Sequence, residues 1–173
     1  MRSRAAFQAA LALHRSSIET FLAAAEAVPE ARWMLPVAEG KWSPGQIAEH
    51  LSLSLEAVAR EVRGESSMRY RLSWWKRLWA RHRYLPGILK KKRFPSGARA
   101  PRETRPAEET APRGEALARL RAANAGIERV YAETPRAARR RLRHPYFGAL
   151  TAPDFFGVIA LHALHHRSQL PSS

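Results

Sequence analysis

The chain has 173 residues, of which 45% are hydrophobic, and it carries a formal net charge of +15 and no cysteine. Such a length and hydrophobic content suffice for one domain with a buried core over residues 1–173, and no run approaches the ~20 apolar residues of a membrane span. The lack of cysteine excludes disulfides, thiolate metal ligands and a cysteine nucleophile. We expect a cytoplasmic protein.

The positive charge is not evenly spread along the chain. Basic residues concentrate in two stretches, 69–105 and 136–143, and Arg greatly outnumbers Lys. A strongly basic chain can bind nucleic acid or an anionic membrane. We ascribe the total charge to an Arg-rich and Ala-rich composition, typical of GC-rich genomes. Because no nucleic-acid-binding motif accompanies the basic stretches, we expect no sequence-specific binding to nucleic acid.

The first predicted helix covers residues 4–28. Its apolar residues recur at helical spacing, its composition is rich in Ala, and Pro29 ends it. The N-terminus begins with charged residues, but Gln8 and His14 interrupt its short apolar run. The segment therefore indicates an amphipathic helix and not a signal peptide.

The second predicted helix has a clear start and a clear end. Ser43 is the expected N-cap, Pro44 occupies the first helical position, and Gln46 completes a capping box. The helix then contains His50 and ends at Gly64.

A long insert or crossover is predicted at about 65–111. Within it, residues 69–83 can form a basic amphipathic helix that places four side chains on one side, Trp75, Leu78, Trp79 and His82, and arginines on the other. The simpler interpretation is that the tryptophans pack on the protein body while the arginines are solvated. The alternative is contact with a membrane interface or with nucleic-acid bases. Residues 94–113 are expected to be an extended connection.

Two further helices complete the pattern. The third covers about 112–134, and the fourth starts at Pro153 and Asp154 and runs to about Leu170. The segment between them contains the sequence HPYFGAL at 144–150, which we expect to be a loop. Four amphipathic helices with a long crossing between the second and third predict an all-α four-helix bundle.

Three histidines form the strongest candidate site. His162 and His166 are four residues apart, so a helix places both rings on one face, one turn apart. His50 lies in a different helix, and a pair plus a single histidine can form a three-nitrogen metal site with an open position. The alternative is three partly buried histidines that only form hydrogen bonds.

Other polar residues have simpler interpretations. His165 is expected on the flank of the site, Glu49 as a solvent or interhelix carboxylate, Gln169 as a capping or packing group, His144 as part of a loop, and Asp154 as a first-turn acid. No HExxH motif, serine triad or Gly-rich phosphate loop is present, so the sequence identifies no catalytic residue and no organic cofactor.

Three motifs carry a family resemblance. They are WSPGQIAEHL at 42–51, HPYFGAL at 144–150 and HALHHRSQL at 162–170. In this order and separation they resemble the DinB-like (DinB/YfiT-like) superfamily of four-helix bundles. The insert at 66–100 departs from the compact family pattern.

The resemblance implies a divalent metal, zinc or nickel, bound by His50, His162 and His166. Family members include S-transferases that use low-molecular-weight thiols, maleylpyruvate isomerase-like proteins and hydrolase-like proteins. We therefore expect a metal-dependent enzyme, S-transferase-like or hydrolase-like, that acts on a small molecule such as a thiol and can form a homodimer. The alternative is a non-catalytic binding module on the same bundle that contacts an anionic surface through the basic, Trp-rich insert.

Overall fold

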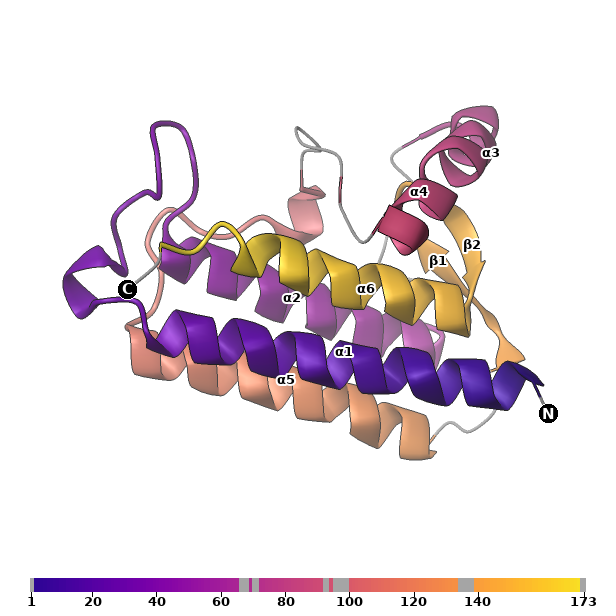
Figure 1. Cartoon of the computed structure of the whole chain (residues 1–173), viewed down its shortest axis with the longest axis horizontal. Helices are drawn as coiled ribbons and strands as arrows, with labels where there is room; N and C mark the ends of the chain where they lie inside the picture. Colours follow the sequence, from indigo (N-terminus) through magenta and orange to yellow (C-terminus); the bar gives the residue numbers. More distant parts are fainter. Residues whose placement is uncertain are drawn as a thin grey trace.

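The computed structural model describes residues 2–65, 69, 72–91, 94, 100–133 and 139–171. Four long helices form its body (Figure 1): α1 (Arg2–Glu26), α2 (Pro44–Arg63), α5 (Arg113–Glu133) and α6 (Ala152–Arg167). Helix α1 packs along α6, and α2 packs along α5. The predicted four-helix bundle is confirmed, and none of the described helices is long and apolar enough to span a membrane.

The start and end of α2 follow the predicted signals. The Ser43 hydroxyl accepts a hydrogen bond from the Gln46 backbone N–H at 3.1 Å, and the Gln46 side chain accepts one from the Ser43 N–H at 3.0 Å. Gly64 ends the helix with a φ of 92°, a left-handed conformation that favours glycine. The position of His50 along α2 is therefore set by a capping box two turns before it.

The core is formed by apolar faces of α1, α2 and α5 and by most of α6, in which residues 155–161 are all buried. Its largest fully buried side chains come from all four helices and from the segments that connect them: Trp33, Phe21, Phe155, Phe156, Ile18, Ile47, Leu51, Leu55, Leu120, Ile127, Leu142 and Leu150. Trp33 satisfies its indole N–H by donating to the Ala111 carbonyl at 3.2 Å. The loop after α1 is thereby tied to the segment just before α5.

A short β-hairpin replaces part of the predicted loop. Strand β1 (Arg141–His144) pairs antiparallel with β2 (Gly148–Thr151), and Leu142 lies opposite Leu150. Both leucines are fully buried, so the pairing turns one face of the hairpin into the core. The prediction of a loop at 144–150 was wrong for the residues in β1 and β2, because these two leucines give too short a pattern to indicate strands.

Within its described residues, the crossing between α2 and α5 carries two short helices and one 3-10 turn: α3 (Trp74–Arg83), α4 (Leu85–Lys91) and η2 (Arg102–Thr104). The predicted amphipathic helix therefore forms, but the tryptophans do not pack on the body. Trp74, Trp75 and Trp79 are 71%, 55% and 57% exposed, so the simpler interpretation of these residues was wrong. Parts of both predicted basic stretches, at 70–71, 92–93, 95–99 and 136–138, lie outside the described residues.

A buried histidine lies within the bundle, away from its ends. His14 of α1 is fully buried, and its ring lies edge-on to Phe156 of α6 at a centroid distance of 5.6 Å. Within the described residues, neither ring nitrogen has a hydrogen-bond partner, and the same is true of the Asn124 carbonyl and the Tyr131 hydroxyl. Burial lowers the pKa of His14 to about 4.

The first prediction concerns this histidine. Because the pKa of His14 is about 4 in the folded protein and 6.5 for an exposed histidine, the unfolded chain binds more protons between those pH values. The folded state should then lose about 3 kcal/mol through His14 as the pH falls from 6.5 to 4. We expect His14→Leu to keep or raise the free energy of unfolding at pH 7 and to reduce its fall with pH, measured by denaturant titration with a metal chelator present.

His82→Leu, at an exposed position, is the matched control and should keep the wild-type dependence on pH. An unchanged pH dependence in His14→Leu would contradict the burial of His14 as a neutral imidazole.

Candidate metal centre

Three histidine side chains meet between α2 and α6. His50 comes from α2, whereas His162 and His166 come from consecutive turns of α6. The Nε2 atom of His162 lies 3.1 Å from Nε2 of His50 and 3.0 Å from Nε2 of His166. One nitrogen from each ring lies within 4.8 Å of the other two. The structure therefore brings together the three residues that the sequence grouped.

These separations suit a metal ion. A tetrahedral zinc ion with Zn–N distances of 2.0–2.1 Å keeps its nitrogen ligands about 3.3 Å apart. The two Nε2 separations at this site, 3.0 and 3.1 Å, are close to that value. Small rotations of the rings are enough to admit an ion.

The orientation of His50 is fixed from outside the site. Its Nδ1 lies 2.5 Å from the backbone carbonyl oxygen of Thr104, in η2. A carbonyl only accepts, so Nδ1 carries the proton and Nε2 presents its lone pair to the other two rings. Metal-bound histidines are commonly oriented in this way by a second hydrogen bond.

The segment that carries Thr104 is held against α2 by side chains of that helix. Glu49 accepts a hydrogen bond from the Ala107 backbone N–H at 3.2 Å, and the Gln46 amide donates to the Ala107 carbonyl at 3.1 Å. Glu49 also lies 3.9 Å from Arg119 of α5. The predicted role of Glu49 as an interhelix carboxylate is confirmed. By binding the Ala107 N–H, Glu49 also helps to hold the nearby Thr104 carbonyl, which accepts from His50, in place.

His166 is oriented by a short relay. The Gln169 amide nitrogen lies 3.1 Å from Nε2 of His165, to which it donates, so the Gln169 oxygen is free to accept. That oxygen lies 2.8 Å from Nδ1 of His166. The proton of His166 is therefore on Nδ1, and its Nε2 also presents a lone pair to the site. His165 lies on the flank, as predicted, and contributes by orienting Gln169.

The electrostatics of the three rings keep them neutral. Burial lowers the pKa of His50, and it lowers that of His166 to about 3. Burial and the neighbouring imidazoles of His166 and His50 hold the pKa of His162 well below its usual range. At neutral pH all three rings are uncharged, which is the form that binds a metal.

The lone pairs provide a test of the fit between this site and a cation. With Nε2 of His50 and of His166 both acting as acceptors, Nε2 of His162 can donate its single proton to one of them. The other two Nε2 atoms then lie about 3 Å apart with no hydrogen between them, so a lone pair faces a nitrogen that cannot donate to it. A bound cation removes this repulsion, so the donor set fits a divalent metal.

Aromatic side chains cover two sides of the site. The Trp42 ring lies 4.9 Å from the His50 ring and 6.2 Å from the His166 ring, measured between centroids. On another side, Phe94 lies 5.7 Å from His162 and 5.9 Å from His165. His162 is partly accessible, whereas His50 and His166 are buried. The site is thus apolar around its ligands and open near His162.

The remaining candidates have structural roles. Nδ1 of His144 accepts from the backbone N–H groups of Tyr146 and Phe147, both at 3.3 Å, and its ring stacks on Phe147. Asp154 pairs with Thr151 at the start of α6, where the Thr151 hydroxyl donates to its carboxylate at 2.7 Å. Asp154 agrees with its prediction as a first-turn acid, whereas His144 lies at the end of β1 and not in the predicted loop.

Sequence reasoning missed three contributors. Thr104 acts through its backbone carbonyl, which no residue type can signal. Phe94 belongs to the insert and approaches the site only through the fold. Trp42 lies within the family-like motif at 42–51, so the sequence did carry a signal for its place beside the ligands.

The comparisons agree with this geometry. The family model of the DinB superfamily matches residues 12–170, a range that includes all three histidines, and the chain therefore belongs to the DinB superfamily. A solved structure, "Crystal structure of TT2238, a four-helix bundle protein", matches with a TM-score of 0.57 and 23% identity, covering 94% of this chain and 95% of that chain. That likeness establishes the fold alone. No curated protein sequence matches significantly.

The second prediction concerns the relay through Gln169. Gln169→Ala removes the acceptor that fixes the proton of His166 on Nδ1, so the ring can turn and its Nε2 can become protonated. Loss of such an outer hydrogen bond typically weakens metal affinity 10- to 100-fold, and we expect a loss of about this size for zinc. Competition with a chromophoric zinc chelator measures it.

Arg167→Ala is the control, since Arg167 is an exposed neighbour in the last turn of α6. It should bind zinc as the wild type does. Equal zinc affinity in Gln169→Ala and the wild type would show that the relay does not orient His166.

Proposed function

We propose that His50, His162 and His166 hold a divalent metal ion, zinc or nickel, and that the chain is a metal-dependent enzyme acting on a small molecule. The observation that carries this proposal is the convergence of three Nε2 atoms, two of them fixed as acceptors by hydrogen bonds of Nδ1. Three protein ligands leave one coordination position open, which is the pattern of catalytic metal sites and not of structural ones.

A metal in such a site lowers the pKa of a bound water or thiol, or polarises a carbonyl group. The protein keeps the imidazoles neutral through burial, and Trp42 and Phe94 exclude water from two sides. The chain has no cysteine, so any thiol must come from a small molecule.

Between the two expected reactions, we favour thiol transfer. Hydrolysis by an activated water generally uses a general base within hydrogen-bond reach of that water. The acid next to His50, Glu49, is already engaged by the Ala107 N–H and lies near Arg119. A thiol with a lowered pKa is a strong nucleophile and needs no separate base at neutral pH. A low-molecular-weight thiol as the nucleophile and a small electrophile as its partner fit this site.

A non-catalytic binding module is the second candidate. The observation that favours it is the exposed aromatic face of α3, which the metal chemistry does not require. The two candidates differ in what a metal-loaded sample should do with substrates.

The third prediction is the metal content of the purified protein. Prepared without chelator, the wild type should contain about one zinc or nickel per chain, because three neutral imidazoles in a buried site bind such ions tightly. His50→Ala and His162→Ala should contain much less, and elemental analysis measures all three. His82→Ala, with an exposed histidine, is the matched control and should equal the wild type. Equal metal content in the wild type and every variant would show that the three histidines do not bind the metal.

The fourth prediction is activity. Metal-loaded wild type should accelerate transfer of a low-molecular-weight thiol to a small electrophile, and His162→Ala should not. Panels of thiols, electrophiles and esters, followed by loss of free thiol or release of acid, measure the rate. Hydrolysis of esters at a rate that does not depend on added thiol would favour the hydrolase hypothesis. Inactivity of fully metal-loaded protein across every panel would favour the binding module.

A further inference from the structure

Helix α3 presents its apolar face to solvent. Its buried residue is the small Ala80, and its large apolar residues are all exposed: Trp74, Trp75, Leu78 and Trp79. At 100° per residue, these four side chains and the exposed His82 occupy one continuous arc on the side of the helix opposite Ala80. A surface helix normally turns its apolar stripe towards the core, so the arrangement here is the reverse.

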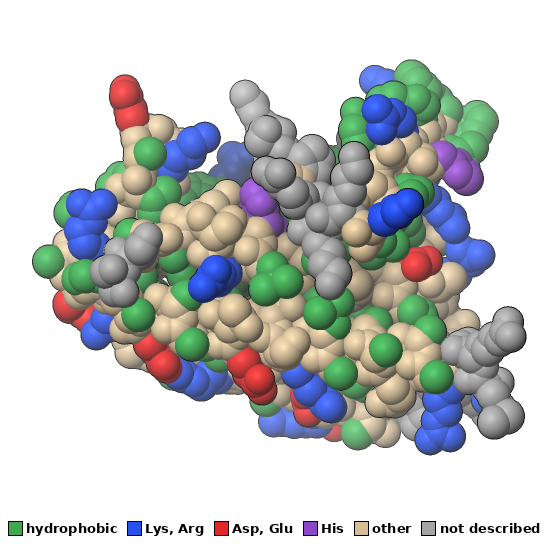
Figure 2. Space-filling view, in the orientation of Figure 1, with side chains coloured by type: hydrophobic (Ala, Val, Ile, Leu, Met, Phe, Trp, Pro, Cys, Tyr) green, Lys and Arg blue, Asp and Glu red, His purple; other side chains and the backbone are tan. Residues whose placement is uncertain are grey.

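The helix also stands away from the bundle. In Figure 1, α3 lies at the outer edge of the molecule, beyond the hairpin and α4. Figure 2 shows hydrophobic side chains gathered over this part of the surface, with basic side chains among them. We call the four exposed side chains of α3 the aromatic face. Tyr84 lies edge-on to Trp79 at a centroid distance of 5.2 Å, and Trp74 and Leu78 border a cavity beside the hairpin.

Cations border the aromatic face on both sides. The helical positions place Lys76 and Arg83 on one edge and Arg77 and Arg81 on the other. Lys76 lies 5.2 Å from the centre of the Trp75 ring. No Asp or Glu occurs in the sequence between Glu65 and Glu103, so the segment that carries the face has basic but no acidic side chains.

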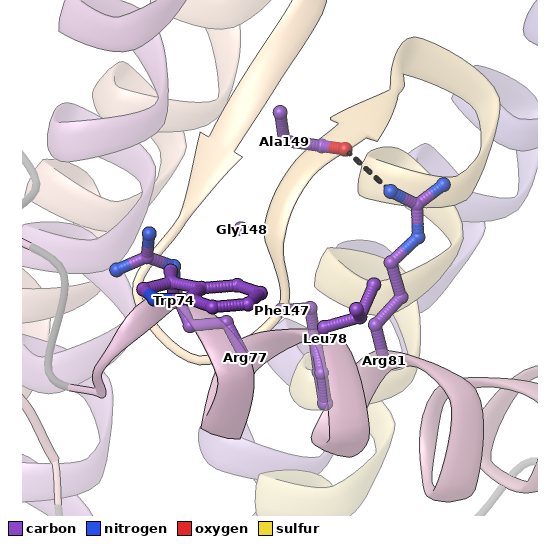
Figure 3. Close-up of a pocket in the computed structure, with 7 residues that line it drawn as sticks. All are labelled: Trp74, Arg77, Leu78, Arg81, Phe147, Gly148 and Ala149. Carbon is purple, nitrogen blue, oxygen red and sulfur yellow. Dashed lines mark hydrogen bonds between the residues drawn. The ribbon is translucent and has the colours of Figure 1, made fainter.

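The inner edge of α3 is fixed to the hairpin. Arg81 donates to the Ala149 carbonyl at 3.3 Å, and Arg77 donates to the Leu72 carbonyl at 2.7 Å. Figure 3 shows the cavity of about 180 Å³ that lies between this edge and the hairpin, with Trp74 and Phe147 also in its wall. Arg81 therefore holds α3 against the hairpin, while Trp75 and Trp79, which do not line the cavity, face solvent.

We propose that the aromatic face of α3 docks the protein on an anionic lipid bilayer. The helix lies in the plane of the interface, with the tryptophans and Leu78 at the boundary of headgroups and acyl chains. Lys76 and Arg83 contact lipid phosphates. An aromatic and leucine face bordered by cations is the composition of interfacial helices. The binding is peripheral and does not involve the metal centre.

Charge and shape decide against two other occupants. A second copy of the chain would bring the same positive edges together, in a protein with a net charge of +15. Single-stranded nucleic acid binds aromatic platforms that lie within a positive groove. The aromatic face is instead the convex side of an isolated helix, which suits a broad planar surface.

Vesicle binding tests the proposal. The full chain is mixed with phosphatidylcholine vesicles that contain or lack phosphatidylserine, and bound protein is separated by flotation. Brominated acyl chains in the same vesicles quench tryptophans that enter the interface. We expect binding to the phosphatidylserine vesicles with quenched fluorescence, weaker binding at raised salt, and little binding to phosphatidylcholine alone.

Two pairs of variants locate the contact. Trp75→Ser with Trp79→Ser should lower the partition coefficient at least about tenfold and remove the quenching, whereas Met34→Ser with Leu35→Ser changes two exposed apolar residues elsewhere and should have no effect. Lys76→Glu with Arg83→Glu should lower binding more than about tenfold, and Arg32→Glu with Arg129→Glu is the matched charge control. Circular dichroism checks that each variant is folded.

The proposal is overturned if the tryptophan pair binds vesicles as well as the wild type does, or if bound protein is not quenched. It is also overturned if the tryptophan pair abolishes self-association or binding to single-stranded DNA while the wild type ignores anionic vesicles. Either outcome would assign the aromatic face to a second copy or to nucleic acid.

Discussion

The arrangement of the bundle around its histidines depends on where two protons are held. The Thr104 carbonyl holds one on Nδ1 of His50, and Gln169 holds one on Nδ1 of His166. Both rings then direct lone pairs at His162. His162 can donate a proton to only one of these two rings, so the other pair of nitrogens repels unless a cation lies between them. The long crossing supplies one of these acceptors, the Thr104 carbonyl, and the end of α6 supplies the other, the Gln169 side chain.

The precision of the site comes from helix ends as much as from the core. The capping box at Ser43 sets the rotation of α2, and the Thr151 cap with the hairpin sets the start of α6. His50 follows its cap by about two turns, and the α6 histidines extend from the hairpin-anchored start towards Gln169. Because α1 packs along α6 and α2 along α5, the two helices that carry ligands belong to different pairs. The site therefore joins the two halves of the bundle.

Much of this could be predicted from sequence. The four helices, the capping box and the end of α2 at Gly64 follow from residue types with local physical roles. The i, i+4 spacing of His162 and His166 predicted their common face, and the position of His50 in a second predicted helix, supported by the family resemblance, made it their partner. These are short-range patterns, for which sequence is informative.

The parts that sequence did not predict depend on tertiary contacts. The hairpin rests on one buried pair, Leu142 and Leu150, and the partner of His50 is a backbone carbonyl. The tryptophans of α3 could have been buried or exposed with the same helical pattern, and only the structure shows Ala80 turned inwards. A pattern defines which side chains share a face, but it does not say whether that face meets the core or solvent.

X-ray absorption at the metal edge of zinc-loaded wild type tests the central claim most directly, because it reports the ligands themselves. The account predicts a nitrogen and oxygen shell of four atoms at about 2.0–2.1 Å, with outer-shell scattering from three imidazoles. A shell of oxygens without imidazole scattering, or the scattering of fewer than three imidazoles, would contradict it. Either spectrum would mean that the three histidines do not hold the metal together.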